Sequence, residues 1–334
     1  MRLSASMHTP SFDGVRDAAR QIAGVAVRTP LIESPALNER LGGRVLLKAE
    51  NLQRAGAFKF RGAYNRISRL TDAEKARGVV AYSSGNHAQA VAAAARMMGT
   101  SAIIVMPADS PKVKVEGVIG FGGEVRMYDR YTESREAIGE EIARTKGSVL
   151  VRPFDDPFVI EGQGTAGLEI VEQAEAVGAE LDQLLCGASG GGLIAGVNLA
   201  MAALKPMVPV IGVEPEAYND TQLSLAAGER LTYAPVERPG LCDALMTDRP
   251  GELTFPINRR LDRVVTVSDA EVAEAVAYAF RTLKLVVEPG GVVSLAALLA
   301  GKAETAGKTT AVVLSGGNVD PGLFSTIIEG RLAR

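Results

Sequence analysis

Short apolar runs alternate with longer amphipathic segments along most of the chain. The runs are rich in valine, leucine and isoleucine, as is typical of strands that are buried on both faces of a parallel sheet. They predict strands at 45–48, 79–82, 102–106, 184–187, 208–213, 264–267 and 310–314, and we expect a further strand in the more polar segment 124–128.

Apolar residues with helical spacing lie between most of these runs. They predict helices at 12–22, 61–70, 88–98, 112–121, 132–145, 165–176, 193–204, 270–283 and 292–300. Strands that alternate with helices in this way indicate parallel sheets covered by helices.

The order of these elements predicts an α/β protein with two αβα domains and parallel twisted sheets. Three strand–helix units between residues 79 and 145 form a small domain, for which we expect the bounds 77–147. This domain is inserted into a large one, built from residues 1–76 and 148–334. A length of 334 residues is enough for each domain to bury its own core.

Composition narrows the classes of function. With 47% hydrophobic and 22% charged residues, the chain is predicted to be compact and folded. The net charge of −3, without a basic block, argues against a nucleic-acid partner. Two cysteines, Cys186 and Cys242, give no disulfide framework. We see no signal peptide and no segment that could cross a membrane, so we expect a cytoplasmic protein.

A lysine between two phenylalanines is the first candidate for chemistry. Lys59 lies in the sequence GAFKFRGA, at 56–63, just before a predicted helix. Apolar neighbours exclude water, and this lowers the pKa of a lysine, so that its neutral amine can attack a carbonyl and form a Schiff base. A lysine that extends its amine to solvent past an apolar stem is the alternative.

Three polar or glycine-rich loops follow predicted strands, at 83–87, 189–192 and 315–318. The loop at 189–192 opens a helix, where backbone N–H groups converge on an anion, although a turn without a ligand has the same pattern. Ligands of open α/β sheets bind beyond the carboxyl ends of the strands. Beside a reactive lysine, these loops favour a phosphorylated aldehyde, pyridoxal phosphate, as the cofactor.

Seven motifs in family order carry a resemblance that spans nearly the whole chain. They are AFKFRGA, SSGNH, GQGT, SGGGL, VEP, EPGG and LSGGN. The chain resembles the fold-type II pyridoxal-phosphate enzymes, of the tryptophan synthase β-like fold, in the serine/threonine dehydratase and serine racemase family.

The resemblance implies roles for individual residues. Lys59 would carry the cofactor as a Schiff base and remove the proton from Cα, and Ser84 would be a second catalytic acid or base. The other cofactor-binding residues would be Phe58 against the ring, Asn86 at its phenolic oxygen, Ser315 at its nitrogen, and the backbone of Ser189, Gly190, Gly191, Gly192 and Leu193 at its phosphate. The substrate would be bound by Ser83, Ser84, Asn86, His87 and Arg135.

The resemblance also implies a homodimer and a cation site. Glu214, the Tyr218 carbonyl and Asp220 would hold a divalent cation. Oxygen ligands suit Mg²⁺, Ca²⁺ or Mn²⁺. A solvated acidic turn is the alternative.

The predicted activity is that of an ammonia-lyase. The Ser315 hydroxyl would face the nitrogen of the cofactor's ring. A hydroxyl does not force this nitrogen to be protonated, and a ring without that proton favours elimination. We therefore expect dehydration of a β-hydroxy amino acid such as L-threonine or L-serine to a 2-oxo acid and ammonia. Serine racemisation, a dehydratase for 3-hydroxyaspartate or phenylserine, and a non-catalytic ligand-binding protein are the alternatives. Because the chain ends soon after the last motif, we expect no C-terminal regulatory domain.

Overall fold

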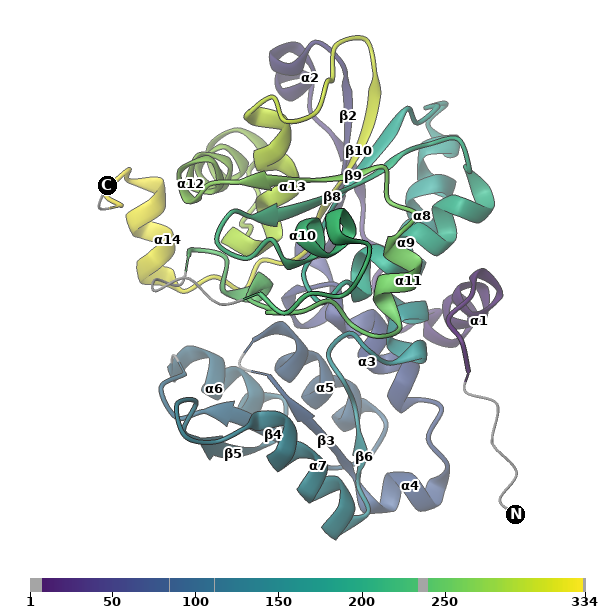
Figure 1. Cartoon of the computed structure of the whole chain (residues 1–334), viewed down its shortest axis with the longest axis vertical. Coiled ribbons are helices and arrows are strands. Elements are labelled where there is room, and N and C mark those ends of the chain that lie inside the picture. Colours follow the sequence, from purple (N-terminus) through teal and green to yellow (C-terminus); the bar gives the residue numbers. More distant parts are fainter. Residues whose placement is uncertain (1–7, 84, 111, 234–239, 333–334) are drawn as a thin grey trace.

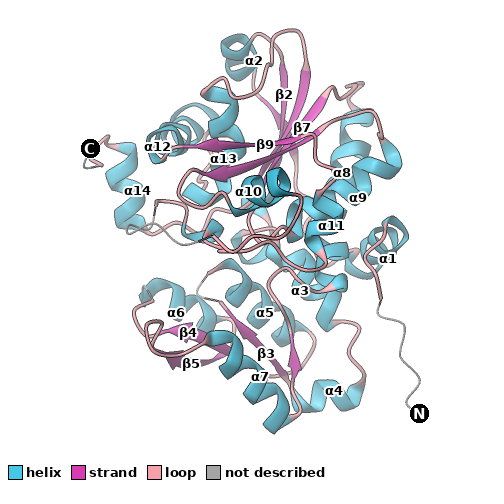
Figure 2. Ribbon diagram, viewed as in Figure 1, coloured by secondary structure: helices cyan, strands magenta, loops and turns pink. Residues whose placement is uncertain are grey.

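The computed structural model describes residues 8–83, 85–110, 112–233 and 240–332. They form two β-sheets, each covered by helices (Figures 1 and 2). The strands are β1 (Leu31–Glu33), β2 (Arg44–Ala49), β3 (Val79–Tyr82), β4 (Ala102–Pro107), β5 (Glu124–Tyr128), β6 (Val149–Leu150), β7 (Gln183–Gly187), β8 (Val210–Pro215), β9 (Arg263–Val267) and β10 (Thr309–Leu314). The α-helices are α1 (Phe12–Ile22), α2 (Pro35–Leu41), α3 (Lys59–Ile67), α4 (Asp72–Arg77), α5 (Asn86–Met97), α6 (Lys112–Gly120), α7 (Arg135–Lys146), α8 (Pro157–Ala176), α9 (Gly192–Leu204), α10 (Asp220–Ala227), α11 (Thr254–Asn258), α12 (Asp269–Tyr278), α13 (Pro289–Leu299) and α14 (Pro321–Ile328). Within the ranges described, none of these helices has the length and apolar character needed to cross a membrane.

The larger sheet has the strand order β1-β2-β10-β7-β8-β9. Its neighbouring strands are parallel, except that the short edge strand β1, which the apolar pattern did not predict, runs antiparallel to β2. Successive side chains point to opposite faces, so Leu47 and Val312 join the core under α12 and α13, while Leu46 and Val313 face α8 and α9. Helices thus cover both faces, which explains why the runs are apolar without interruption.

The smaller sheet has the order β5-β4-β3-β6, and all of its strands are parallel. Val79 and Ala81 face α3 and α5, and Val80 and Val105 pack toward α7. The expected small segment, 77–147, omits β6, which pairs with β3 through Val79↔Val149 and Val80↔Leu150. Strand β6, which the expected bounds assign to the large domain, thus pairs in the smaller sheet. The division into an inserted and an enclosing domain stays a prediction.

Helix α8 begins earlier than predicted, at Pro157 and not at residue 165. The two glycines of the sequence GQGT within it disfavour a helix, because glycine destabilises a helix interior. Close contacts with two neighbouring helices explain why glycines are needed in this helix. A Cβ on Gly162 would lie 2.6 Å from the Cα of Gly62 in α3, and one on Gly164 would lie 2.8 Å from the carbonyl oxygen of Gly196 in α9. Glycines let α8 bring α3, which carries Lys59, close against the larger sheet's helices.

Candidate active site

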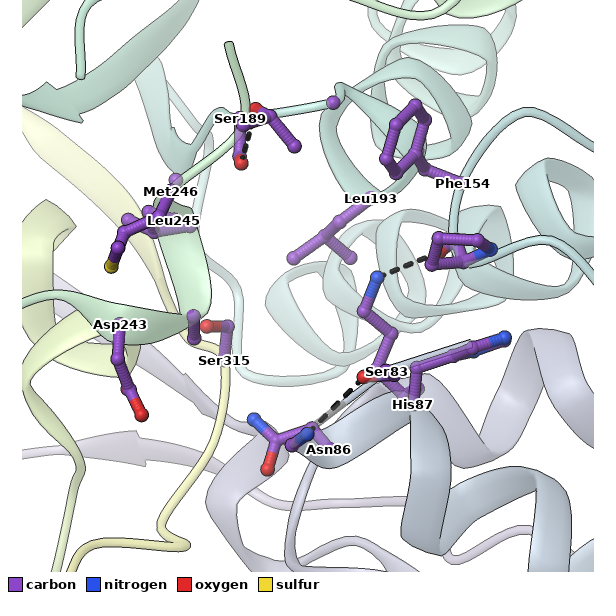
Figure 3. A pocket seen from close by; sticks show the side chains of 18 of the residues that line it. Ser83, Asn86, His87, Phe154, Ser189, Leu193, Asp243, Leu245, Met246 and Ser315 are labelled. Atoms are coloured by element: carbon purple, nitrogen blue, oxygen red, sulfur yellow. Dashed lines mark hydrogen bonds between the residues drawn. The ribbon is translucent and has the colours of Figure 1, made fainter. Parts of the chain in front are cut away.

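One cavity brings together loops from both sheets (Figure 3). Its walls come from the residues that follow β3, β7 and β10, together with Phe58 and Lys59 at the start of α3. The cavity thus lies at the carboxyl ends of parallel strands, where α/β proteins bind their ligands. Of the residues predicted for the site, Phe58, Lys59, Ser83, Asn86, His87, Arg135, Ser189, Gly190, Gly191, Gly192, Leu193 and Ser315 line it. Ser84 lies outside the described residues.

The amine of Lys59 lies in the wall of this cavity. Its Nζ donates a hydrogen bond of 2.7 Å to the carbonyl oxygen of Pro153, and it lies 5.0 Å from the centre of the Phe58 ring. Burial lowers the pKa of Lys59 to about 8, because protein atoms replace the water that would solvate its charge. The backbone N–H of Phe58 donates to the carbonyl of Ser315, which fixes the start of α3 against the end of β10.

The loop after β7 has no room for side chains at two of its glycines. A Cβ on Gly190 would lie 2.4 Å from the Phe154 ring, and one on Gly191 would lie 2.5 Å from Nδ2 of Asn258. Gly191 also has a φ of +92°, a left-handed conformation that favours glycine. It precedes the first residue of α9, so this loop presents the free N–H groups of a helix start to the cavity.

Asn86 is the first residue of α5, and both the nitrogen and the oxygen of its side-chain amide form hydrogen bonds. Its Nδ2 donates to Oε1 of Glu288 at 2.5 Å, and its Oδ1 accepts a hydrogen bond of 2.8 Å from Nδ2 of Asn318. Burial raises the pKa of the Glu288 carboxyl to about 8. An amide nitrogen has two hydrogens, and Glu288 accepts only one of them, so the other is available to a ligand.

The imidazole of His87 is buried beneath the cavity and is neutral. Its Nε2 lies 2.9 Å from the carbonyl oxygen of Val151, so this nitrogen is assigned the proton. Burial, and next the charge of Lys59, lower the pKa of His87 to about 3. The ring therefore offers no positive charge to a substrate carboxylate. The predicted contact of His87 with the substrate stays a prediction.

Arg135 reaches the cavity from the first turn of α7. Its Nε donates to Oε1 of Glu136 at 2.7 Å, and its guanidinium carbon lies 5.8 Å from the centre of the Tyr82 ring. Arg135 therefore already has a carboxylate partner on its own helix.

Several residues that line the cavity were not predicted from the sequence. Glu288 lies within the quoted motif EPGG, at the start of α13, so a signal was present but no role was assigned to it. Phe154, Asn318, Lys114 and Asp243 also line the cavity. Of these, Asn318 ends the quoted motif LSGGN, whereas Lys114 and Asp243 belong to no motif that we recognised.

Comparison with known proteins identifies the type of site. Residues 22–316 match the protein family described as "Pyridoxal-phosphate dependent enzyme". The chain belongs to this family. Over 97% of its length, it is 42% identical to the L-threo-3-hydroxyaspartate ammonia-lyase of Saccharomyces cerevisiae, of which the match covers 98%. It is 39% identical to the L-threonine ammonia-lyase of Thermotoga maritima, over 97% of this chain and 79% of that one.

Solved structures confirm the fold. The structure of maize serine racemase superposes with a TM-score of 0.88, at 37% identity, over 97% of this chain and 98% of the other. The predicted α/β architecture and the predicted family of pyridoxal-phosphate enzymes are therefore both confirmed.

The cavity of this pyridoxal-phosphate enzyme fits its cofactor. The glycine loop at the start of α9 forms a cradle in which a side chain would collide with Phe154 or Asn258, and such a cradle suits a phosphate. Lys59 supplies an amine of lowered pKa, and Asn86 has a hydrogen left for the cofactor's ring. Ser315, at the end of β10, brings a hydroxyl into the same cavity.

Two of the predicted cation ligands, Glu214 and Asp220, are fully buried carboxylates outside this cavity. Burial raises the pKa of both carboxyls, and the charge of Glu214 raises that of Asp220 further. Backbone N–H groups of Thr221 and Gln222 donate to Glu214, whereas both oxygens of Asp220 lack a hydrogen-bond partner in the described part of the chain. A buried carboxylate without a donor, such as that of Asp220, suits a divalent cation.

The remaining cation ligands would have to be neutral oxygens. Among the described residues, no cluster of three His, Cys, Asp or Glu side chains could hold a metal ion. A carbonyl such as that of Tyr218, which is also buried, and water molecules would complete the coordination. The cation site therefore stays a prediction.

Proposed function

We propose that this protein eliminates water from a β-hydroxy amino acid such as L-threonine or L-serine, giving a 2-oxo acid and ammonia. One observation carries the proposal: a lysine amine of lowered pKa lies in the same cavity as a glycine cradle at a helix start. The ammonia-lyases among the relatives support this choice of reaction.

The proton that must move is the one on Cα of the amino acid. Bound pyridoxal phosphate supplies an electron-withdrawing ring that makes this proton acidic. Lys59 is the proposed base, because an amine whose pKa is about 8 is partly neutral near physiological pH and can accept a proton at Nζ. The carbonyl of Pro153 orients this amine.

The remaining residues are proposed to bind and orient. Lys59 would hold the cofactor's aldehyde, and the backbone of residues 189–193 would hold its phosphate at the start of α9. Phe58 would pack against the ring, Asn86 would donate its remaining hydrogen to the phenolic oxygen, and Ser315 would face the ring nitrogen. For the substrate carboxylate, we propose Ser83 and the N–H groups at the start of α5, with Arg135 approaching from α7.

A panel of β-hydroxy amino acids tests this function. Purified protein loaded with pyridoxal phosphate should release a 2-oxo acid from at least one of L-threonine, L-serine, L-threo-3-hydroxyaspartate and L-threo-phenylserine. A coupled dehydrogenase assay measures the product, and the D-enantiomers are the controls. A protein that shows the visible band of bound cofactor but releases no 2-oxo acid from the panel would contradict the proposal.

Serine racemisation is the second candidate, because serine racemases are among the similar proteins. It requires an acid or base on the opposite face of the ring, for which the sequence predicts Ser84. Chiral analysis of the same L-serine reactions decides between the two. D-serine that accumulates faster than pyruvate would make racemisation the main activity.

We also propose that Glu214, Asp220 and the Tyr218 carbonyl hold a divalent cation that stabilises the phosphate loop. The hydroxyl of Thr221, next to Asp220, donates to the carbonyl oxygen of Ser189 at 3.2 Å. Through this hydrogen bond, the position of α10 is linked to that of the loop. The predicted homodimer and the cytoplasmic location stay predictions.

Removing the cation should make stability depend on pH. The folded-state pKa values of Glu214 and Asp220 are raised, so the protons they bind stabilise the fold at low pH, and this contribution is lost as the pH rises through the folded pKa values. In EDTA, we expect the melting temperature to fall by roughly 5 °C between about pH 6 and pH 9.

Added Mg²⁺ or Ca²⁺ should remove this dependence, since the cation then neutralises both carboxylates. Differential scanning fluorimetry measures it. Glu172→Gln is the control, because it removes an exposed carboxylate that pairs with Arg28. It should leave the effect of EDTA on the melting temperature unchanged. Identical melting curves with EDTA and with Mg²⁺ at every pH would contradict a cation site.

A further inference from the structure

An ion pair joins the two sides of the cavity. Lys114, on α6 beside the smaller sheet, donates through Nζ to Oδ2 of Asp243, which begins the short helix η3 (Asp243–Leu245) on the larger sheet's side. Both residues line the same cavity as Lys59, and Asp243 lies on the same side of it as Ser315 (Figure 3). Neither is needed for the elimination chemistry proposed above.

The two members of this pair differ in their access to water. The side chain of Lys114 is 14% exposed and that of Asp243 is 50% exposed. Asp243 can therefore turn toward solvent and be hydrated at little cost. Lys114 cannot, and a largely buried ammonium without an anion is strongly disfavoured. When Asp243 leaves, another carboxylate has to take its place.

The other charged groups of the cavity are already in use. Arg135 is paired with Glu136 and is proposed for the carboxylate on the substrate's Cα, Lys59 is the proposed base, and the ring of His87 is neutral. The carboxyl of Glu288, the remaining acid in the wall, accepts from Asn86 and has a raised pKa. Glu136, the partner of Arg135, is as exposed as Asp243, at 49%, but the Arg135 side chain is itself 43% exposed and can be hydrated without a partner. Lys114 is thus the cation in the described cavity wall that is largely buried while its carboxylate partner is exposed.

We infer that Lys114 is the receptor for a carboxylate on the substrate's side chain, with Asp243 occupying that place when no such substrate is bound. The preferred substrates are then β-hydroxy amino acids with an acidic side chain, such as L-threo-3-hydroxyaspartate. L-Serine and L-threonine carry only a hydrogen or a methyl group there and cannot replace Asp243. This inference rests on the proposed function, because it assigns the substrate of that same site.

Replacing Lys114 tests the assignment. In Lys114→Met, the ratio of kcat/KM for L-threo-3-hydroxyaspartate to kcat/KM for L-serine should fall about 100-fold, as expected when a buried charge partner is removed. Lys112→Met is the matched control. Lys112 lies on the same helix, is 90% exposed and faces Glu116, so the ratio should stay at the wild-type value.

Asp243→Asn distinguishes two roles of the ion pair. Lys114 either binds the substrate's side-chain carboxylate, or the pair only holds the two sides of the cavity together. If Lys114 receives the substrate, this variant frees it, and KM for L-threo-3-hydroxyaspartate should stay the same or fall. If the pair only holds the cavity closed, Lys114→Met and Asp243→Asn should impair L-serine and L-threo-3-hydroxyaspartate equally. That second result would overturn the inference.

Binding of L-aspartate and L-alanine gives a readout that does not depend on turnover, because neither amino acid has a β-hydroxyl to lose. Calorimetry on the cofactor-loaded protein should show tighter binding of L-aspartate, and Lys114→Met should abolish the difference. Equal affinities in the wild type would overturn the inference even if L-serine is dehydrated. Binding of L-aspartate that depends on Lys114, without turnover of any β-hydroxy amino acid, would support the inference and instead overturn the proposed function.

Discussion

Lys59→Ala should abolish the release of 2-oxo acids from β-hydroxy amino acids, with kcat lowered by at least about 10⁴-fold. The reason is that one amine is proposed both to hold the cofactor and to take the Cα proton. The other lysine in the described cavity wall, Lys114, is engaged by Asp243. The coupled dehydrogenase assay measures the loss, and the visible band of the bound cofactor should vanish with it.

Lys59→Arg is the control for charge, because it keeps a cation but cannot form a Schiff base. It should be as inactive as the alanine variant. The pH dependence is a second readout. Since burial lowers the pKa of Lys59 to about 8, its amine is mostly protonated, and to that extent unreactive, below this pH. The rate at which cofactor-free protein takes up pyridoxal phosphate should therefore rise with pH and level off above it. Turnover above about 1% of wild type in Lys59→Ala would contradict the role of Lys59.

Arg61→Met should lower the free energy of unfolding by about 3–5 kcal/mol, because it leaves uncompensated charge in the interior. Arg61 and Glu50 are both fully buried and lie 2.8 Å apart, and Arg61 also binds Glu169 at 2.7 Å. Lys48 binds Glu169 from the other side at 2.6 Å, so two cations balance two carboxylates. Burial alone raises the pKa of Glu50, but the charge of Arg61 and their hydrogen bonds bring it below its ordinary value.

Arg28→Met is the matched control for Arg61. It removes an exposed ion pair with Glu172, whose side chains are 53% and 46% accessible, and should cost less than about 1 kcal/mol. Arg61→Lys should be intermediate, because an ammonium cannot bridge both carboxylates as a guanidinium does. Urea unfolding followed by circular dichroism measures all three variants. Equal midpoints for the Arg61 and Arg28 variants would show that the buried network contributes no more than a surface pair.

The sequence predicted those elements whose physical cause is local. The strand β3 lies where the apolar run indicated it, since the run is itself the buried part of the strand. The first turns of α8 were not predicted, because the glycines there serve contacts with α3 and α9, which are distant in sequence. The pairing of β6 with β3 was not predicted either, because a strand of two residues is too short to show a hydrophobic periodicity.

The candidate site shows the same limit. Motifs located Lys59, Asn86 and the glycine loop, and all of them line one cavity. Asn86 is oriented by the hydrogen bond that it donates to Glu288, which lies 202 positions further along the chain. Lys114 and Asp243 are separated by 129 positions. A partner at such a distance leaves no spacing to recognise, so these contacts become visible only in the folded chain.

The connection from β6 to α8 contacts three parts of the site within four residues. The carbonyl of Val151 accepts from His87, the carbonyl of Pro153 accepts from Lys59, and the ring of Phe154 fills the space beside Gly190. Most connecting segments on a protein surface tolerate insertions and deletions. In this segment, adding or removing one residue would shift all three contacts together, and the imidazole, the amine and the glycine loop would lose their supports at once. The length of this connection is therefore as constrained as the identity of the lysine it contacts.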